Sequence, residues 1–144
     1  MFYERIRDGY KVVTDLQSHN LDVIHGYLSR SYWASGVPRD LVEKAIKHSL
    51  CFSLYKNEEQ IGFGRVITDY TSIGYLADVF ILEGYQGRGL GKFLVQSILD
   101  HPELQTLRRF ILVTADAHEL YRKFGFDSPE KPEMYMDMCP ARTW

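Results

Sequence analysis

A glycine-rich turn near the middle of the chain has the residue types and spacing of a phosphate-binding site. It spans residues 86–92, reads QGRGLGK, and directly follows a run of mostly apolar residues. Apolar residues after the turn recur at helical spacing. As a helix, this segment would have four of them on one face: Leu90, Phe93, Leu94 and Ile98. A helix start leaves several backbone N–H groups unpaired and carries roughly half a positive charge. Glycine lets such backbone approach a ligand closely, so we expect this turn to bind phosphate groups, with Arg88 and Lys92 adding positive charge.

Two common phosphate-binding patterns do not fit this turn. The Walker pattern requires Ser or Thr after Gly-Lys to hold magnesium, and here Phe93 follows Lys92. The dinucleotide pattern GxGxxG/A requires a small residue where the chain has Lys92. A plain strand-to-helix turn without a ligand is the other alternative. The three glycines at positions 87, 89 and 91 favour a binding turn over that alternative.

Length and composition narrow the class of protein. A chain of 144 residues has the size of one domain, so we expect residues 1–144 to form a single domain. The formal net charge of −2, without a basic stripe, argues against a nucleic-acid partner. No run approaches the ~20 apolar residues of a membrane span, and the N-terminus is charged where a signal peptide is apolar. We therefore expect a cytoplasmic protein that does not bind membranes.

The cysteines and histidines predict neither a disulfide nor a metal site. Cys51 and Cys139 lie far apart and have no CxxC partner, so both are expected to be free thiols. The histidines do not have the spacing of metal ligands. We interpret these four as surface or helix residues: His19, His25, His48 and His101.

Helices and strands are expected to alternate around the glycine turn. Residues that favour strands predict strands at 10–15, 51–56, 60–69, 73–82, 110–114 and 134–138. Helical periodicity and end signals predict helices at 21–30, 38–50, 90–100 and 117–124. The runs at 73–82 and 110–114 are rich in apolar residues, so we expect both strands to be buried. This order predicts an α/β (α+β) fold with helices on both faces of a mixed sheet.

Two sequence motifs flank the predicted helix at 90–100. The first is Q-x-x-G-x-G at residues 86–91, and the second is A-x-x-L-Y-x-K-x-G-F at residues 117–126. Together they resemble the motifs of the GNAT superfamily of N-acetyltransferases, and the resemblance is strong over residues 73–126. It implies a mixed, mostly antiparallel sheet with splayed middle strands, and acetyl-CoA as the cofactor. Many members of that family dimerise, so the resemblance also allows a homodimer.

The resemblance implies which residues hold the cofactor. The exposed backbone of Val79, Phe80 and Ile81 would bind the pantetheine arm. Thr114 stands where the family often has an asparagine that contacts the cofactor. The pyrophosphate would lie in the turn formed by Gln86, Gly87, Arg88, Gly89, Leu90, Gly91 and Lys92.

Tyr121 is the residue expected to carry the chemistry. In the family, the matching tyrosine gives a proton to the departing coenzyme A thiolate, and a phenol with a pKa near ~10 is protonated at neutral pH. A tyrosine that only fills the helix face is the alternative. The attacking amine must be neutral, so a base or a water chain is needed. The candidate bases are Asp78, Glu83, Asp116 and His118.

The residues that would contact the acceptor are expected in a loop. In the family, the connection between the first two helices borders the acceptor pocket, and here it spans residues 31–37. We expect Tyr32 and Trp33, together with Asp78, to contact a primary amine of a small molecule or a peptide. A loop that is anchored by packing Trp33 into the core is an equal alternative.

The sequence leaves other functions open. A non-catalytic acetyl-CoA-binding sensor or partner-binding module of the same fold would keep the glycine turn but would not catalyse acyl transfer. An unrelated phosphate-binding domain would prefer ATP or NAD, and a related enzyme would use a longer acyl donor.

Overall fold

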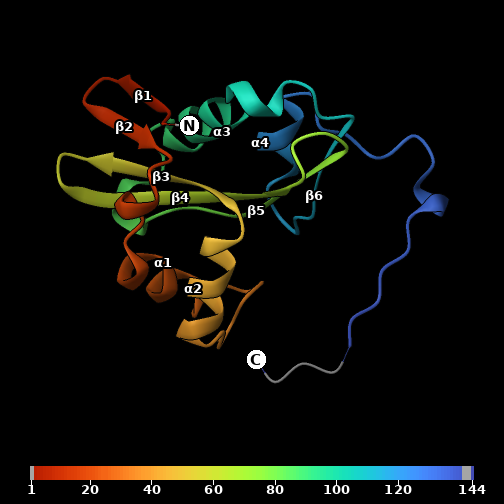
Figure 1. The fold of residues 1–144 in the computed structure, drawn as a ribbon, viewed down its shortest axis with the longest axis horizontal. Helices are drawn as coiled ribbons and strands as arrows, with labels where there is room; N and C mark the ends of the chain where they lie inside the picture. The colour runs from red at the N-terminus through yellow and green to blue at the C-terminus, as the bar shows by residue number, and fades with distance from the viewer. Residues whose placement is uncertain (1, 141–143) are drawn as a thin grey trace.

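A six-stranded sheet forms the centre of the protein in the computed structural model, which describes residues 2–140 and 144. The strands lie in chain order, and neighbours are antiparallel except for the parallel pair β5 and β6. Their bounds are β1 Glu4–Arg7, β2 Tyr10–Val13, β3 Leu50–Lys56, β4 Glu59–Thr68, β5 Ile73–Ile81 and β6 Arg109–Leu112. Figure 1 shows the sheet between helices above and below it.

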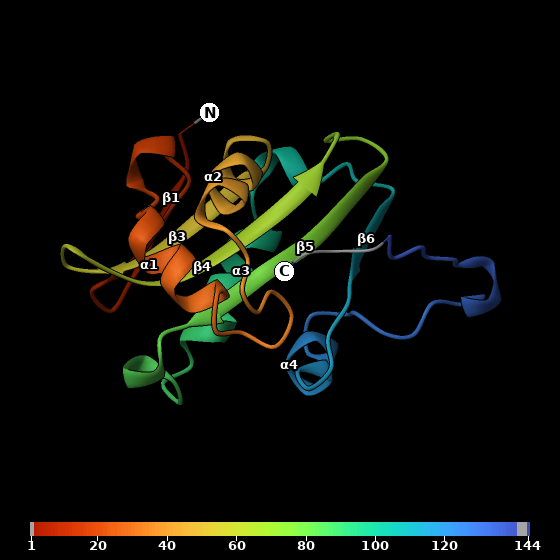
Figure 2. The same ribbon diagram turned by 90° about the horizontal axis from the view of Figure 1, so that it is seen from below.

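Two pairs of helices cover opposite faces of the sheet (Figure 1, Figure 2). α1 (Leu21–Leu28) and α2 (Arg39–Lys47) lie on one face, and α3 (Leu90–Leu99) and the short α4 (His118–Arg122) lie on the other. This arrangement confirms the predicted α/β (α+β) class with helices on both faces. Within the described residues, none of the helices has the length and apolar character that a membrane crossing requires.

The sheet contributes apolar side chains to two cores because alternate residues of a strand point to opposite faces. Phe52 lies in the core under α3, and Phe63 lies in the core under α1 and α2; both side chains are fully buried. α3 is the best-anchored helix, and most of its residues are buried, namely Leu90, Phe93, Leu94, Val95, Ser97 and Ile98. Each fully buried apolar side chain contributes ~1.5–3 kcal/mol, so α3 is a rigid support for the glycine turn at its start.

The sequence prediction missed β1, although its turn carries a signal. Asp8 and Gly9 connect β1 to β2 with φ values of 52° and 83°. Asp-Gly favours such a two-residue hairpin turn, in which both residues have positive φ. The sequence of β1, ERIR, contains a single apolar residue, so its alternation is too weak to reveal a strand.

Two predictions for the C-terminal part of the chain are wrong. β6 is the last strand of the sheet and Val113 beyond it is exposed, so the predicted strand at 110–114 is an edge strand and not a buried one. Residues 134–138 form no strand and pair with none of the described strands. Their residue types suit a strand, but a strand also needs a partner edge, and the described part of the chain brings none to this segment.

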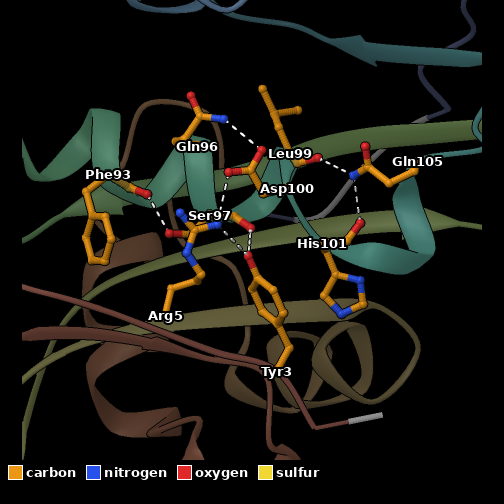
Figure 3. Close-up of polar contacts among 9 residues, drawn as sticks. All are labelled: Tyr3, Arg5, Phe93, Gln96, Ser97, Leu99, Asp100, His101 and Gln105. Atoms are coloured by element: carbon orange, nitrogen blue, oxygen red, sulfur yellow. Dashed lines mark hydrogen bonds and ion pairs between the residues drawn. The ribbon is translucent and has the colours of Figure 1, made fainter.

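Polar contacts hold the end of α3 against the first hairpin (Figure 3). The Tyr3 hydroxyl donates a hydrogen bond to the carbonyl oxygen of Ser97 at 2.7 Å. Arg5 forms an ion pair with Asp100, with a distance of 2.9 Å between Nη1 and Oδ2. These contacts fix α3 at the end opposite the glycine turn.

His101 is fully buried just after α3, so its predicted surface or helix position is wrong. Its Nδ1 accepts a hydrogen bond from the N–H of Glu103 at 3.1 Å. Burial lowers the pKa of His101 below its ordinary value, so the ring is neutral in the folded protein at pH 7. In the unfolded chain the same ring takes up a proton below pH ~6.5.

This difference predicts a stability that depends on pH. The stability that neutral His101 allows is fully present above about pH 6.5, the pKa of the ring in the unfolded chain. It is lost as the pH falls from that value toward the lowered pKa of His101 in the folded protein. We expect the free energy of unfolding, measured with urea, to decrease between about pH 7 and pH 5. In His101→Asn this decrease should become smaller. The remaining decrease comes from His19, because burial lowers the pKa of that residue as well. An unchanged slope in His101→Asn, or a smaller slope in the exposed control His48→Asn, would contradict this assignment.

Candidate active site

β5 and β6, the last two strands of the sheet, diverge along their length. Their parallel pairing joins residues 73–76 of β5 to Arg109–Leu112. β5 continues to Ile81, so among the described strands its second half has no partner on the β6 side. A splay is therefore present, but it lies between the last two described strands and not between middle strands as predicted. Val79, Phe80 and Ile81 lie in this second half, where backbone groups on that side can bind a ligand.

The glycine turn connects the end of β5 to α3. A 3-10 turn at Glu83–Tyr85 comes first, and the side-chain amide of Gln86 donates a hydrogen bond to the carbonyl oxygen of Ile81 at 2.9 Å. Gly87 and Gly89 have φ values of 82° and 76°, in the left-handed region that favours glycine. A Cβ at either position would meet nothing within 4 Å. The space over the turn is therefore open to a ligand.

Two lysines converge at the start of α3. Lys92 lies in the first turn of α3, and Lys123 directly follows α4. Contact with Lys123 lowers the pKa of Lys92 below its ordinary value. Two ammonium groups this close repel each other, and an anion bound beside them would be stabilised. The glycine turn, the helix start and the two lysines therefore fit a pyrophosphate group.

A β-bulge at Asp78 and Val79 changes the direction of β5 before the strand reaches its end at Ile81. Asp78 and Val79 of β5 lie opposite the single residue Gly64 of β4. Asp78 has a φ of 56°, which is rare inside a strand. At Gly64, a Cβ would lie 2.8 Å from Cδ1 of Ile98, so a larger residue there would force the end of the Ile98 side chain to move. Bulges of this kind redirect a side chain, and here they redirect Asp78.

The redirected Asp78 carboxylate is held by two side chains. Nε1 of Trp33 donates a hydrogen bond to Oδ1 at 2.9 Å, and Nε of Arg65 donates one to Oδ2 at 2.9 Å. The side chains of Arg65 and Asp78 are only 16% and 13% exposed. Removing one charge from such a pair leaves the other charge buried without compensation. The carboxylate therefore anchors Trp33 and the loop that carries it.

Tyr32 connects that loop to the segment before α4. Its hydroxyl accepts a hydrogen bond from the N–H of Ala115 at 3.1 Å and donates one to Oδ1 of Asp116 at 3.4 Å. In the same segment, the Thr114 hydroxyl oxygen accepts a hydrogen bond from the N–H of Ala117 at 3.1 Å. Thr114 therefore orders this segment, and its contact with a cofactor stays a prediction.

Two cavities meet where β5 and β6 diverge. The α2-side cavity has a volume of about 620 Å³ and is bordered by residues of α2, with Arg65 and Asp78 also in its lining. The turn-side cavity has a volume of about 580 Å³ and extends along β5 to Gln86 and Gly91. Six residues line both cavities: Tyr32, Trp33, Val79, Asp116, Ala117 and Tyr121. A molecule in one cavity can therefore meet a molecule in the other at this junction.

Tyr121 lies at the junction of the two cavities. α4 carries it, and its ring packs edge-on against Phe126 with 6.0 Å between the centroids. Burial, followed by the nearby Tyr32 and Asp116, raises the pKa of Tyr121 to about 12. The phenol therefore keeps its proton over the whole neutral range and can donate it to a group at the junction.

The four candidate bases differ in their surroundings. Glu83 accepts hydrogen bonds from Arg30 at 2.9 Å and 3.2 Å, and this contact lowers its pKa. Asp78 is committed to its buried ion pair. His118 is exposed and is not among the residues that line either cavity. Asp116 lines both cavities, so it is the best placed of the four to accept a proton at their junction.

The structure brings most of the predicted site residues into one region around the junction. Gly87, Arg88, Gly89 and Lys92 line neither cavity, and the side chain of Leu90 is buried in the core, so only its backbone can face a ligand. The side chain of Phe80 is also buried and stacks on Tyr27 with 4.1 Å between the centroids. The sequence prediction missed Arg65 and Lys123 as site residues. Lys123 could have been found from its position in the second motif, whereas Arg65 had no local signal.

Comparison with known proteins identifies the family. Residues 20–126 match the sequence profile of the Acetyltransferase (GNAT) family. The chain belongs to the GNAT acetyltransferase family. A Gibberella zeae protein, FG08082, which is an acetyltransferase by name, is 34% identical, and the match covers 81% of this chain and 78% of that protein.

Solved structures support the same assignment for this GNAT protein. A GNAT-family protein of Xanthomonas campestris pv. campestris, xcc2953, is 44% identical with a TM-score of 0.88, over 90% of this chain and 92% of that chain. SA2161 of meticillin-resistant Staphylococcus aureus is 27% identical with a TM-score of 0.69, over 90% of this chain and 99% of that chain.

Proposed function

We propose that this GNAT protein uses acetyl-CoA to acetylate a primary amine of a small molecule or a peptide. The observation that carries the proposal is the junction of two cavities at Tyr121, one of which leads to the glycine turn. Membership of the family supports acetyl transfer. The two cavities support a donor and an acceptor that reach the junction from different sides.

The turn-side cavity is the proposed site of acetyl-CoA. The glycine turn, with Lys92 and Lys123 beside it, would hold the pyrophosphate. The backbone of Val79 and the N–H of Ile81 would bind the amides of the pantetheine arm, since the carbonyl oxygen of Ile81 already accepts a hydrogen bond from Gln86. When bound, acetyl-CoA supplies an acyl thioester, which an amine can attack directly.

Tyr121 is the general acid in this proposal. The amine nitrogen forms a bond to the acetyl carbonyl carbon, and the bond between that carbon and sulfur breaks. Tyr121 donates its hydroxyl proton to the departing sulfur and regains a proton from solvent. Asp116 accepts the proton that the amine nitrogen loses, directly or through a water molecule. The raised pKa of Tyr121 ensures that the proton donor is present at neutral pH.

The α2-side cavity is the proposed acceptor site. Tyr32 and Trp33 offer aromatic rings, which attract cationic groups such as an alkylammonium before it loses its proton. Arg65 and Asp78 neutralise each other, so the pair adds no net charge to the cavity. Most of the other lining residues are apolar and include Leu41, Val42, Ile67, Tyr75 and Val113. These features suit an amine with an apolar body.

An activity screen tests the proposed function. Purified protein would be incubated with acetyl-CoA and a panel of primary amines, with thiol release followed by absorbance and acetylated product by mass spectrometry. We expect release of one thiol per acetylated amine, and faster turnover for amines with apolar bodies. Binding of acetyl-CoA without any acetylated amine would contradict the proposal and support a non-catalytic binding module.

Asp78→Asn is predicted to destabilise the protein and weaken acceptor binding. Asparagine tolerates the positive φ and can still accept a hydrogen bond from Trp33, so the change removes mainly the charge that faces Arg65. We expect the free energy of unfolding to fall by ~1–3 kcal/mol. The KM for the amine should rise several-fold, whereas the Kd for acetyl-CoA should stay nearly constant.

The exposed ion pair between Arg5 and Asp100 provides the matched control. Exposed pairs contribute ~0–1 kcal/mol, so Asp100→Asn should change stability much less and leave the KM unaltered. Equal losses of stability in the two variants would contradict the anchoring role of Asp78.

A further inference from the structure

The floor of the α2-side cavity is formed by neighbouring residues of β4 and β5. Arg65 lies opposite Ala77, and Ile67 lies opposite Tyr75. Because alternate residues of a strand point to the same face, these side chains share one face of the sheet with Phe63, which is buried under α1 and α2. All five residues line the cavity. Arg65 is the one charged side chain among them.

Two hydrogen bonds fix the Arg65 guanidinium and leave part of it unused. Nε donates to Oδ2 of Asp78 at 2.9 Å, and Nη1 donates to Oγ of Ser49 at 3.1 Å. Nη2 has no hydrogen-bond partner among the described residues, and it is not one of the fully buried atoms that lack a partner. It is therefore open to the cavity that Arg65 lines. Because the other two nitrogens are held, Nη2 has a fixed position and can donate a directional hydrogen bond.

Asp78 places this donor close to the junction of the two cavities. Its carboxylate accepts hydrogen bonds from Trp33 at one oxygen and from Arg65 at the other, both at 2.9 Å. Trp33 lines both cavities, so it lies at the junction. A single carboxylate group therefore separates Arg65 from a junction residue. A molecule with its amine at the junction would reach Nη2 with a group only a few bonds from that amine.

The charges around the cavity favour a neutral oxygen over a carboxylate as the partner of Nη2. Asp78 compensates the charge of Arg65, and Asp116 adds a second carboxylate to the lining. The charged side chains that line the cavity therefore sum to a negative charge, which repels an anion. An amide carbonyl oxygen accepts a hydrogen bond without carrying a charge.

We infer that Arg65 is a specificity-determining residue that donates a hydrogen bond from Nη2 to an amide carbonyl oxygen of the acceptor. The acceptor class is an amine with a carboxamide on the neighbouring carbon, as at the N-terminus of a peptide. Its apolar body would lie against Ile67 and Tyr75. A site built to hydrogen-bond one group rejects analogues without it, because the donor is then left unpaired. The inference rests on the proposed function for the reaction, whereas recognition by Arg65 is measurable as binding.

Two amines that differ only in the carboxamide test this inference. Leucinamide has the group, and 3-methylbutylamine is the same molecule without it. NMR titrations at about pH 6, where both amines are protonated, give their Kd values without turnover. We expect the wild type to bind leucinamide at least about tenfold more tightly, because hydrogen bonds from a charged donor are strong. Leucine, with a carboxylate in place of the carboxamide, should bind more weakly than leucinamide.

Arg65→Lys keeps the positive charge that faces Asp78 but removes the Nη2 donor. The preference for leucinamide over 3-methylbutylamine should fall at least about tenfold, both in Kd and in kcat/KM with acetyl-CoA. The Kd for acetyl-CoA should change little, and circular dichroism would verify the fold. Arg39→Lys is the matched control, because Arg39 forms an exposed ion pair with Asp22 at 2.6 Å and does not line the cavity. It should keep the wild-type preference.

The outcomes separate this inference from the proposed function. An Arg65→Lys variant with the wild-type preference, or an equal loss in Arg39→Lys, would overturn the inference. A wild type that binds 3-methylbutylamine as tightly as leucinamide, or leucine more tightly, would overturn it whether or not the variant folds. Binding in the predicted order without acetylation of either amine would contradict the proposed function and still support recognition by Arg65.

Discussion

Gly89→Val is expected to remove most of the affinity for acetyl-CoA. Gly89 has a φ of 76° and lies directly before the first turn of α3, where a Cβ would project into the open space proposed for the pyrophosphate. A branched side chain there blocks the close approach of backbone and phosphate. We expect the Kd for acetyl-CoA, measured by calorimetry, to rise at least ~10-fold, which corresponds to ~1.4 kcal/mol. The left-handed backbone should also cost ~1–2 kcal/mol of stability.

Gly84→Val separates the loss of binding from the loss of stability. Gly84 lies in the 3-10 turn before the glycine turn, has no left-handed φ, and also has open space around its Cβ position. The control should therefore bind acetyl-CoA nearly as well as the wild type. If Gly89→Val stays folded and binds acetyl-CoA normally, the placement of the pyrophosphate is wrong.

Tyr121→Phe is expected to lower kcat about 100-fold, the low end of the ~10²–10⁴-fold that general acid catalysis typically contributes. The ring would still pack against Phe126, so the fold and the Kd for acetyl-CoA should change little. Since the pKa of Tyr121 is raised to about 12, its deprotonation should not limit the wild-type rate anywhere near neutral pH. Steady-state kinetics with a saturating amine would measure the effect.

Tyr55→Phe is the matched control, because it removes a tyrosine hydroxyl that lies outside the site. Its hydroxyl donates a hydrogen bond to the Ser18 carbonyl oxygen at 2.6 Å, and Tyr55 lines neither cavity. Its kcat should equal that of the wild type. An unaltered kcat in Tyr121→Phe would remove this residue from the mechanism and leave it a packing role.

The sequence was sufficient for elements whose signal is local. The predicted strand at 73–82 is β5, Ile73–Ile81, and the predicted helix at 90–100 is α3, Leu90–Leu99. The glycine turn lies between them, and its phosphate chemistry follows from a helix start and small residues within one short segment. Such features depend on neighbours in the chain, so the chain alone predicts them.

Features that depend on distant residues could not be predicted from the sequence. Asp78 contacts Arg65 and Trp33, which are 13 and 45 residues away, and its redirected side chain depends on a bulge opposite Gly64. Residues 134–138 have the composition of a strand, but only a partner edge makes a segment a strand. The charge state of His101 likewise depends on burial, which the sequence did not reveal.

The central claim is that the glycine turn and the splay between β5 and β6 form an acetyl-CoA site. Calorimetric titration of the purified protein with acetyl-CoA, with ATP and NAD as controls, tests it most directly. We predict micromolar binding of acetyl-CoA and no comparable binding of either control. Failure to bind acetyl-CoA, or tighter binding of ATP or NAD, would contradict the account.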